Sequence, residues 1–287
     1  MKDMLISVVI STYNRPDALE RVLAAGIAQF DPSYELIVAD DGSTEATRET
    51  VARIAQTSPV HIEHVWHPDD GFRLSGIRNK GIARARGDYI IFLDGDCVPQ
   101  HDFVLRHRML AAEGAIVTGS RILLDEMLTR DVIANKISLP DQSVGFWLKQ
   151  RLGGHANKVA PIFVKLPDRN WRQFDHFKWR GIKGCNMSAW RSDLERVNGF
   201  DENFVGWGHE DADLVVRLAN CGVHRKLGAY ATEIFHLWHR ENVRDQANSN
   251  YERVRARLEN GSTRAERGLA ELPQEYRASD TLDAAAD

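Results

Sequence analysis

The chain has 287 residues, 43% hydrophobic and 27% charged, and its 37 basic and 41 acidic residues leave a formal net charge of −4. This composition excludes disorder as the main state, and the slightly acidic balance argues against a nucleic-acid partner held by bulk positive charge. No apolar run approaches the ~18 residues of a membrane-spanning helix, and the N-terminus lacks the features of a signal sequence. Three cysteines without metal-ligand spacing favour a reduced compartment. We expect a cytoplasmic protein.

The first 120 residues alternate the signals of strands and helices. Short runs rich in β-branched residues at 5–10, 35–39, 61–66 and 89–93 predict strands. Apolar residues at helical spacing predict a helix after each of the first three strands. Strands that alternate with helices in this way form βαβ units. We therefore predict an α/β fold with a mostly parallel central sheet flanked by helices.

The rest of the chain divides into three parts. The periodic pattern weakens over 121–180, which we interpret as an excursion covering one edge of a site. Order returns over 184–240, with a helix that starts near Gly206 and a strand near 231–235. From residue 241 an apolar stripe at helical spacing (Val243, Ala247, Tyr251, Val254 and Leu258) predicts a helical extension, followed by a frayed tail.

Two acidic clusters follow predicted strands, Asp40-Asp41 and Asp94-Gly95-Asp96. In an open parallel sheet, ligands bind beyond the carboxyl ends of the strands. Carboxylates crowded there repel each other unless a cation joins them, and oxygen ligands suit Mg²⁺ or Mn²⁺. The sequence has neither a Walker motif nor a Gly-x-Gly-x-x-Gly after its first strand. A metal–diphosphate ligand is therefore favoured over an ATPase or dinucleotide site.

Five segments carry a resemblance to a known family: 10–16 (Ile-Ser-Thr-Tyr-Asn-Arg-Pro), 38–43 (Val-Ala-Asp-Asp-Gly-Ser), 77–81, 87–96 and 199–213. Together they resemble a family 2 glycosyltransferase of the GT-A fold. The last segment is similar to the C-terminal half of β-1,4-galactosyltransferases and chondroitin-polymerase-type enzymes. The resemblance implies that residues 1–120 bind a UDP-sugar donor and that 121–240 hold the acceptor and the catalytic residues of the same domain. Residues 241–287 form the helical extension and tail.

The same resemblance implies which residues hold the donor. They are Thr12, Tyr13, Arg15, Asp40, Arg78, Asp94 and Gly95. The loop after the first strand would lie against base and ribose. Asp40 would accept a hydrogen bond from the uracil imide N–H, and Arg78 would approach the diphosphate. Asp94 opens the DXD motif and would touch the ribose and the metal.

The metal ligands implied by the resemblance are Asp96, His236 and His239. The two histidines stand three residues apart, and imidazole suits borderline Mn²⁺ better than Mg²⁺. We therefore favour Mn²⁺, with Mg²⁺ as the alternative. Whether both histidines bind, or one packs beside Trp238, stays open at this stage.

Asp211, in the pair Glu210-Asp211, matches the family's catalytic base. Attack by a sugar hydroxyl on an anomeric carbon needs a base for its proton and a cation for the departing diphosphate. A single base opposite the leaving group inverts the anomeric configuration. The resemblance therefore implies inverting transfer.

Two residues are candidates for acceptor binding. Trp207 lies between two glycines and either stacks on a sugar ring, which we favour, or fills the core. Asn186 either bonds sugar hydroxyls or belongs to a turn. The segment 146–151 combines aromatic and basic residues and would either contact the inner surface of the cytoplasmic membrane or form a lid over the acceptor groove. We favour the lid.

The leading hypothesis is a metal-dependent inverting glycosyltransferase that moves a hexose or N-acetylhexosamine from a UDP-sugar to a saccharide, free or lipid-linked, in bacterial cell-surface polysaccharide synthesis. A sugar-nucleotide pyrophosphorylase is an alternative, but it would carry a glycine-rich basic loop after the first strand. A non-catalytic carbohydrate- or nucleotide-binding relative would have lost the DXD or Glu-Asp residues, and both are present. A zinc hydrolase built on His236 and His239 lacks the usual nearby Glu.

Overall fold

The computed structural model describes residues 4–174, 177–179, 181–240 and 246–276. The strands are β1 (Ile6–Thr12), β2 (Tyr34–Asp40), β3 (Ile62–Trp66), β4 (Tyr89–Asp94), β5 (Cys97–Pro99), β6 (Ala115–Thr118), β7 (Arg121–Leu123), β8 (Asn186–Trp190), β9 (His224–Leu227) and β10 (Ile234–His236). The helices are α1 (Pro16–Ile27), α2 (Glu45–Ala55), α3 (Leu74–Arg84), α4 (Phe103–Leu110), α5 (Glu126–Ile133), α6 (Val144–Leu152), α7 (Ala160–Phe163), α8 (Arg191–Arg196), α9 (Glu210–Asn220) and α10 (Ala247–Asn260).

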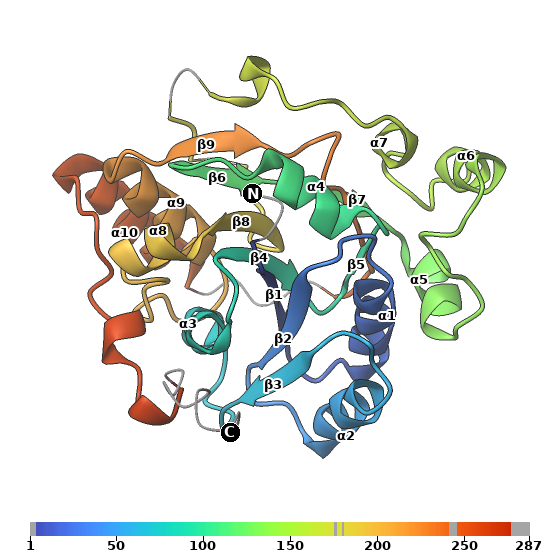
Figure 1. Ribbon diagram of the computed structural model, residues 1–287, viewed down its shortest axis with the longest axis horizontal. Helices are drawn as coiled ribbons and strands as arrows, with labels where there is room; N and C mark the ends of the chain where they lie inside the picture. The colour runs from blue at the N-terminus through green and yellow to red at the C-terminus, as the bar shows by residue number, and fades with distance from the viewer. Residues whose placement is uncertain (1–3, 175–176, 180, 241–245, 277–287) are drawn as a thin grey trace, which may run out of the picture.

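A seven-stranded sheet forms the centre of the molecule, in the order β3-β2-β1-β4-β8-β6-β9 (Figure 1). The first four strands in that order run parallel, β6 and β9 are parallel to each other, and β8 is antiparallel to both of its neighbours. Strands from both sides of residue 120 therefore belong to one sheet. The predicted α/β class with a mostly parallel sheet is confirmed.

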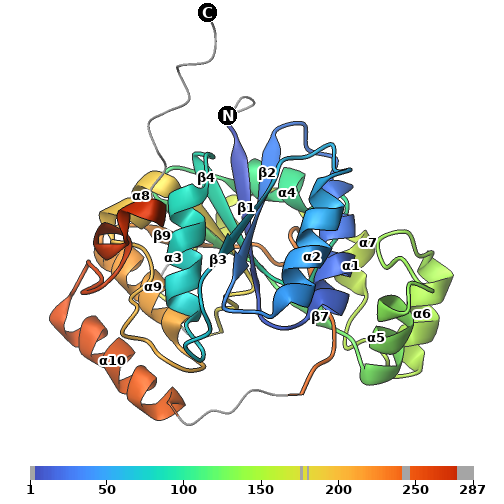
Figure 2. The same ribbon diagram turned by 90° about the horizontal axis from the view of Figure 1, so that it is seen from below.

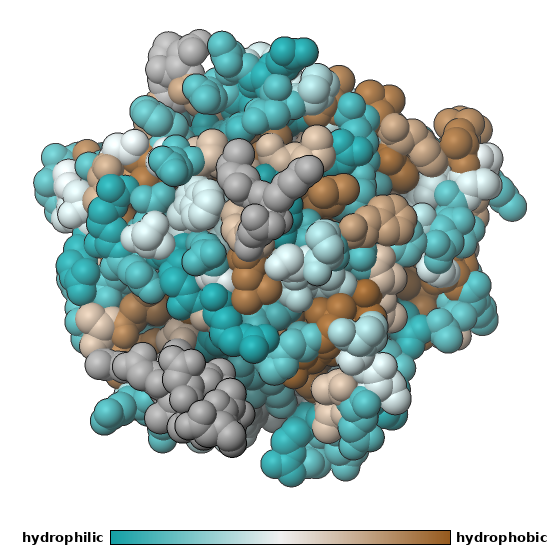
Figure 3. Space-filling model, in the orientation of Figure 1, coloured by the Kyte–Doolittle hydropathy of each residue, from teal (hydrophilic) through white to brown (hydrophobic). Residues whose placement is uncertain are grey.

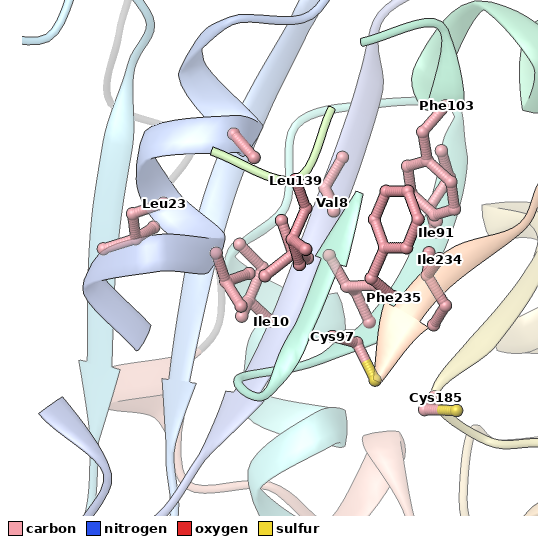
Figure 4. Packing of buried hydrophobic residues seen from close by; sticks show 14 of the residues in the cluster. Val8, Ile10, Leu23, Ile91, Cys97, Phe103, Leu139, Cys185, Ile234 and Phe235 are labelled. Atoms are coloured by element: carbon pink, nitrogen blue, oxygen red, sulfur yellow. The ribbon is translucent and has the colours of Figure 1, made fainter. Parts of the chain in front are cut away.

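Helices cover both faces of this sheet (Figure 2). Alternate residues of a strand point to opposite faces. Val8 and Ile10 accordingly pack toward α1, as Figure 4 shows, whereas Val9 packs with Ile77 of α3 and Leu214 of α9. The runs of apolar residues in β1, β2 and β4 thus serve two cores at once, which is why these strands show no polar alternation in sequence.

A second sheet has the order β5-β10-β7. Strand β10 pairs antiparallel with β5, which begins one residue after Asp96, and parallel with β7, near the start of the irregular region. His236, at the end of β10, stands opposite Cys97. This pairing carries residues from three distant parts of the sequence to the edge where β4 ends.

The excursion predicted at 121–180 contains β7 and the helices α5, α6 and α7, which protrude at one end of the molecule (Figures 1 and 2). The C-terminal extension includes α10, and Val254 of α10 packs with Phe204 and with Val216 of α9. Val243, at the start of the predicted stripe, lies outside the described residues. Among the residues that the structure describes, no helix is long and apolar enough to cross a membrane.

Candidate active site

A cavity of about 1130 Å³ opens where β1 and β4 end. Its walls come from the loop after β1, the turn after β4, β7, the segment 181–185, the loop before α9 and the segment after β10. Small-molecule sites commonly enclose about 300–1,000 Å³. The cavity therefore has room for one large ligand or two smaller ones side by side.

Most of the predicted site residues line this cavity. They are Thr12, Tyr13, Arg15, Arg78, Asp94, Gly95, Asp96, Trp207, Glu210, Asp211, His236 and His239. Asp40 and Asn186 do not. The structure thus brings 12 of the 14 predicted residues to one cavity and leaves Asp40 and Asn186 outside it.

Asp96, His236 and His239 form a compact three-residue cluster. One ligand atom from each lies within 4.8 Å of the others. His239 Nε2 is 3.3 Å from Asp96 Oδ2, and His236 Nε2 is 3.9 Å from Asp96 Oδ1. The pairing of β5 with β10 and a hydrogen bond from Leu237 N to Asp96 O (2.9 Å) hold these residues together. Both histidines therefore belong to the cluster.

The chemistry of this cluster fits a divalent transition metal such as Mn²⁺. Burial lowers the pKa of His236, which favours the neutral imidazole that binds metal. His239 Nδ1 lies 2.7 Å from the carbonyl oxygen of Arg240, an arrangement that places the proton on Nδ1 and leaves Nε2 toward Asp96. One carboxylate and two imidazoles leave room for further ligands from a bound molecule.

The turn after β4 packs directly on the end of β1. Gly95 N donates to Ser11 O at 2.7 Å, and a Cβ at Gly95 would lie 2.9 Å from Thr12 Oγ1. Glycine is thus required between the two aspartates for this close approach. Thr12 Oγ1 is buried and has no hydrogen-bond partner among the described residues. It is an unused hydroxyl at the wall of the cavity.

Arg78 connects Asp94 of the DXD motif with Glu210 of the Glu210-Asp211 pair. Its side chain is only 1% exposed and lies 2.9 Å from Asp94 Oδ1 and 3.4 Å from Glu210 Oε1. Its Nε also donates to Ser11 Oγ at 3.2 Å. Arg78 therefore holds Asp94 and Glu210 in place at the wall of the cavity.

Glu210 is the first residue of α9, and its environment favours the neutral acid. Burial, together with the charge of Asp211, raises the pKa of Glu210 to about 7. Arg78 opposes this shift in part. Near neutral pH the Glu210 carboxyl group is thus poised between its protonated and ionised forms.

Asp211 is presented to the cavity by a sharp turn. Gly206, Gly208 and His209 all have positive φ (75°, 109° and 73°), and α9 begins immediately afterwards. Asp211 Oδ2 accepts from Gly184 N at 2.9 Å, and Oδ1 accepts from Ala212 N at 2.7 Å. Each carboxylate oxygen has a second lone pair, so Asp211 retains acceptor capacity toward a ligand.

Asp40 does not face the cavity. It is fully buried, with Oδ1 accepting from Ser43 N at 2.8 Å and Oδ2 lying 3.0 Å from His64 Nε2. The next residue, Asp41, lines the cavity and is bonded to His67 and to Arg73 N. The alternation of side chains along β2 continues one residue past the strand, which sends the two carboxylates to opposite sides. Of these two aspartates, the one that faces the cavity is therefore Asp41.

Asn186 is also unavailable to a ligand. Its side chain is fully buried, and its amide nitrogen donates to the carbonyl oxygens of Ser120 and Thr232. Its Oδ1 lies 3.2 Å from His107 Nε2. With donors and acceptor used inside the protein, Asn186 holds β8 against the neighbouring segments. The predicted acceptor contact is wrong.

The helix α6 is no lid. None of its residues lines the cavity, and its Trp147 is buried against Phe235. The rings of these two residues are stacked, with centroids 4.7 Å apart. The lid hypothesis for residues 146–151 is therefore wrong.

Several cavity residues were missed by sequence reasoning. They are Arg121, Trp179, Lys183, Trp238 and Tyr251. Arg121, on β7, donates to Cys185 Sγ at 3.9 Å and has no ion-pair partner among the described residues. The available signal for Arg121 was a basic residue shortly after the apolar strand β6. The aromatic residues gave no such signal, since isolated aromatic residues are common in cores.

Comparison with known proteins agrees with this geometry. The family model described as "Glycosyl transferase family 2" matches residues 7–189, more than half of the chain. The chain belongs to glycosyltransferase family 2. A second model, described as "N-terminal domain of galactosyltransferase", matches this family 2 glycosyltransferase over residues 171–240, which include the Glu210-Asp211 pair, His236 and His239.

Curated relatives of this glycosyltransferase include two of known activity. Validoxylamine A glucosyltransferase of Streptomyces hygroscopicus subsp. jinggangensis is 32% identical over 232 residues, covering 76% of this chain and 52% of that protein. Chondroitin synthase of Escherichia coli is 30% identical over 242 residues, covering 76% of this chain and 33% of that protein. The chain spans about half or less of the length of these relatives.

Solved structures support the fold. S. aureus TarS 1–349 in complex with UDP matches with a TM-score of 0.58 at 13% identity, covering 93% of this chain and 68% of that one. Mannosyltransferase PcManGT from Pyrobaculum calidifontis, in complex with GDP-Man and Mn²⁺, matches with a TM-score of 0.52 at 18% identity, covering 89% and 61%. The predicted GT-A fold is thereby confirmed.

Proposed function

We propose that this chain is a metal-dependent, inverting glycosyltransferase that transfers a hexose or N-acetylhexosamine from a UDP-sugar to a saccharide hydroxyl. One observation carries the proposal: the Asp96–His236–His239 cluster and the Asp211 carboxylate line the same cavity. That arrangement would provide a metal site for a diphosphate and a separate base within one pocket. The TarS complex with UDP supports the donor class.

Asp96, His236 and His239 would hold Mn²⁺, or Mg²⁺ in its place. A metal bound there would offset the negative charge that develops on the leaving diphosphate. The PcManGT complex with GDP-Man and Mn²⁺ supports this choice of ion. Arg121 lines the same cavity without an ion-pair partner in the described part of the chain, and its positive charge suits a phosphate oxygen.

Asp41 is the carboxylate proposed to accept the uracil imide hydrogen bond, in place of Asp40. It lines the cavity beside the loop that carries Thr12, Tyr13 and Arg15. The buried Thr12 hydroxyl has no partner in the described protein and would gain one from the bound nucleotide. Tyr13 is 48% exposed and donates to Asp69 at 2.9 Å, so its ring is free to lie against the base.

Asp211 would take the proton from the acceptor hydroxyl as that oxygen attacks the anomeric carbon. The acceptor oxygen–carbon bond forms, the bond to the diphosphate breaks, and one base on one face gives inversion. Gly184 N and Ala212 N fix the orientation of the Asp211 carboxylate. Glu210, the residue before Asp211, is itself held by Arg78 at 3.4 Å. Trp207, 37% exposed at the cavity wall, would stack on a sugar ring.

The chondroitin synthase relative supports a saccharide acceptor. We propose that the chain acts in the synthesis of a bacterial surface polysaccharide, at the cytoplasmic side, on a free or lipid-linked acceptor. The test is release of UDP from a panel of UDP-hexoses and UDP-N-acetylhexosamines, with Mn²⁺ and with a chelator. Mn²⁺-dependent turnover of one donor supports the proposal. Absence of turnover for every donor, with and without oligosaccharide acceptors, would point to a non-catalytic relative.

A further inference from the structure

The outward face of α6 is an apolar stripe open to solvent. Val144, Leu148 and Leu152 are 52%, 51% and 89% exposed. Their spacing of four residues places them in one row along the helix. Met127 on the neighbouring α5 is 63% exposed. Figure 3 shows hydrophobic atoms on this protruding end of the molecule, at the position that α6 occupies in Figure 1.

The stripe cannot turn inward, because the opposite face of α6 is fixed. Trp147 is 1% exposed and stacks on Phe235 with an angle of 3° between the rings. Ser143 caps the helix by accepting a hydrogen bond from Phe146 N at 3.2 Å. Since the helix is formed and anchored, its apolar row stays exposed to solvent.

The charges of α6 are all of one sign. The helix carries Lys149 and Arg151, both exposed, and no acidic residue. The cations of α5 and its C-terminal flank are paired, Arg130 with Glu126 and Lys136 with Asp131. Neither Lys149 nor Arg151 has an ion-pair partner among the residues that the structure describes. Two unpaired cations thus flank the stripe on a chain whose net charge is −4.

We propose that α6 docks this protein onto the surface of an anionic phospholipid bilayer. A helix anchored on one face, with a stripe of large aliphatic side chains on the other and cations beside it, matches the way amphipathic helices lie in a membrane interface. The aliphatic side chains enter the acyl boundary while Lys149 and Arg151 contact lipid phosphates. A symmetric contact between two copies is disfavoured, because it would bring the cations of both copies together.

This docking surface is linked to the candidate active site. Trp147 stacks on Phe235, and the next residue is His236 of the metal-ligand cluster. No residue of α6 lines the cavity itself. The proposal does not rest on the proposed transferase activity, and its test uses a different readout.

The test is flotation of the full chain with vesicles of phosphatidylcholine alone or mixed with phosphatidylglycerol. We expect binding to the mixed vesicles only. The double variant Leu148→Gln/Leu152→Gln and the charge reversal Lys149→Glu/Arg151→Glu should each lower partitioning by at least about tenfold. Matched controls are Met109→Gln, at a methionine 54% exposed on α4, and Arg48→Glu, at an exposed arginine on α2. Neither control should change binding.

Three results would overturn the proposal. The first is equal binding of wild type and both α6 variants, and the second is no binding to either vesicle. The third is a change from dimer to monomer in the Leu148→Gln/Leu152→Gln variant on size-exclusion chromatography, which would assign the stripe to self-association. Because the substituted side chains are exposed, the variants should melt at the wild-type temperature, and that measurement confirms that they are folded.

Discussion

The two carboxylate clusters of the cavity are built in opposite ways. Asp96 is positioned by strand pairing, and its oxygens face two imidazole rings, an environment that gathers ligands for a cation. Asp211 is positioned at the start of a helix, and its oxygens accept from two backbone N–H groups. The first arrangement suits a metal and the second suits an oriented base. Arg78 contacts Asp94 on one side and Glu210 on the other, and so joins the two.

The largest effect is expected at the base. Asp211→Asn keeps the shape of the side chain but removes its capacity to take a proton. Transfer should fall by about 10³-fold while nucleotide binding with Mn²⁺ stays at the wild-type level. Steady-state kinetics and a binding isotherm on the same preparation check both parts. Transfer within a few-fold of wild type would show that another group is the base.

The next effect is expected at the metal cluster. Asp96→Ala removes the only carboxylate of the cluster and should weaken Mn²⁺-dependent UDP binding by at least about tenfold. His236→Ala and His239→Ala should act in the same direction. Titration of UDP at several Mn²⁺ concentrations measures the effect. If UDP binding by Asp96→Ala kept an unchanged Mn²⁺ dependence, Asp96 would not be a ligand.

Glu210 should make the stability of the protein depend on pH. Its pKa is about 7 in the folded protein against 4.5 for a free glutamate, so the folded state holds the proton more tightly. Stability then falls as pH rises from about 4.5 to about 7, by up to roughly 3 kcal/mol. Glu210→Gln removes this contribution to the pH dependence of the unfolding free energy. Urea unfolding at pH 5 and pH 8 should show a smaller loss for Glu210→Gln than for wild type, and equal losses would refute the assignment.

The smallest effect separates two adjacent aspartates. Asp41→Asn should weaken UDP binding by about tenfold, because the amide presents an N–H as well as an oxygen to the uracil imide. Asp40→Asn should leave UDP affinity unchanged and lower the melting temperature, since Asp40 bonds Ser43 and His64 in the interior. The reverse pattern would restore Asp40 as the base-reading residue.

Much of this architecture could be predicted from the sequence. The apolar strands, the DXD motif and the two late histidines are local signals, and the parallel topology brings them to one edge. The motif alone could not show which of Asp40 and Asp41 faces the cavity. That depends on the exact residue at which β2 ends, since neighbouring side chains along a strand point to opposite sides. The predictions for Asn186 and for α6 were wrong for a related reason. Their environments depend on His107, Thr232 and Phe235, which are distant in sequence.

The proposed function requires a nucleotide and a metal to share one cavity with the base. The most direct test is calorimetric titration of UDP into the wild-type chain, with and without Mn²⁺, alongside GDP and CDP. The predicted result is UDP binding that requires Mn²⁺ and exceeds the binding of the other two nucleotides. Tighter binding of GDP would contradict the assignment of Asp41 as a uracil reader, and no binding of any nucleotide would contradict the proposed function itself.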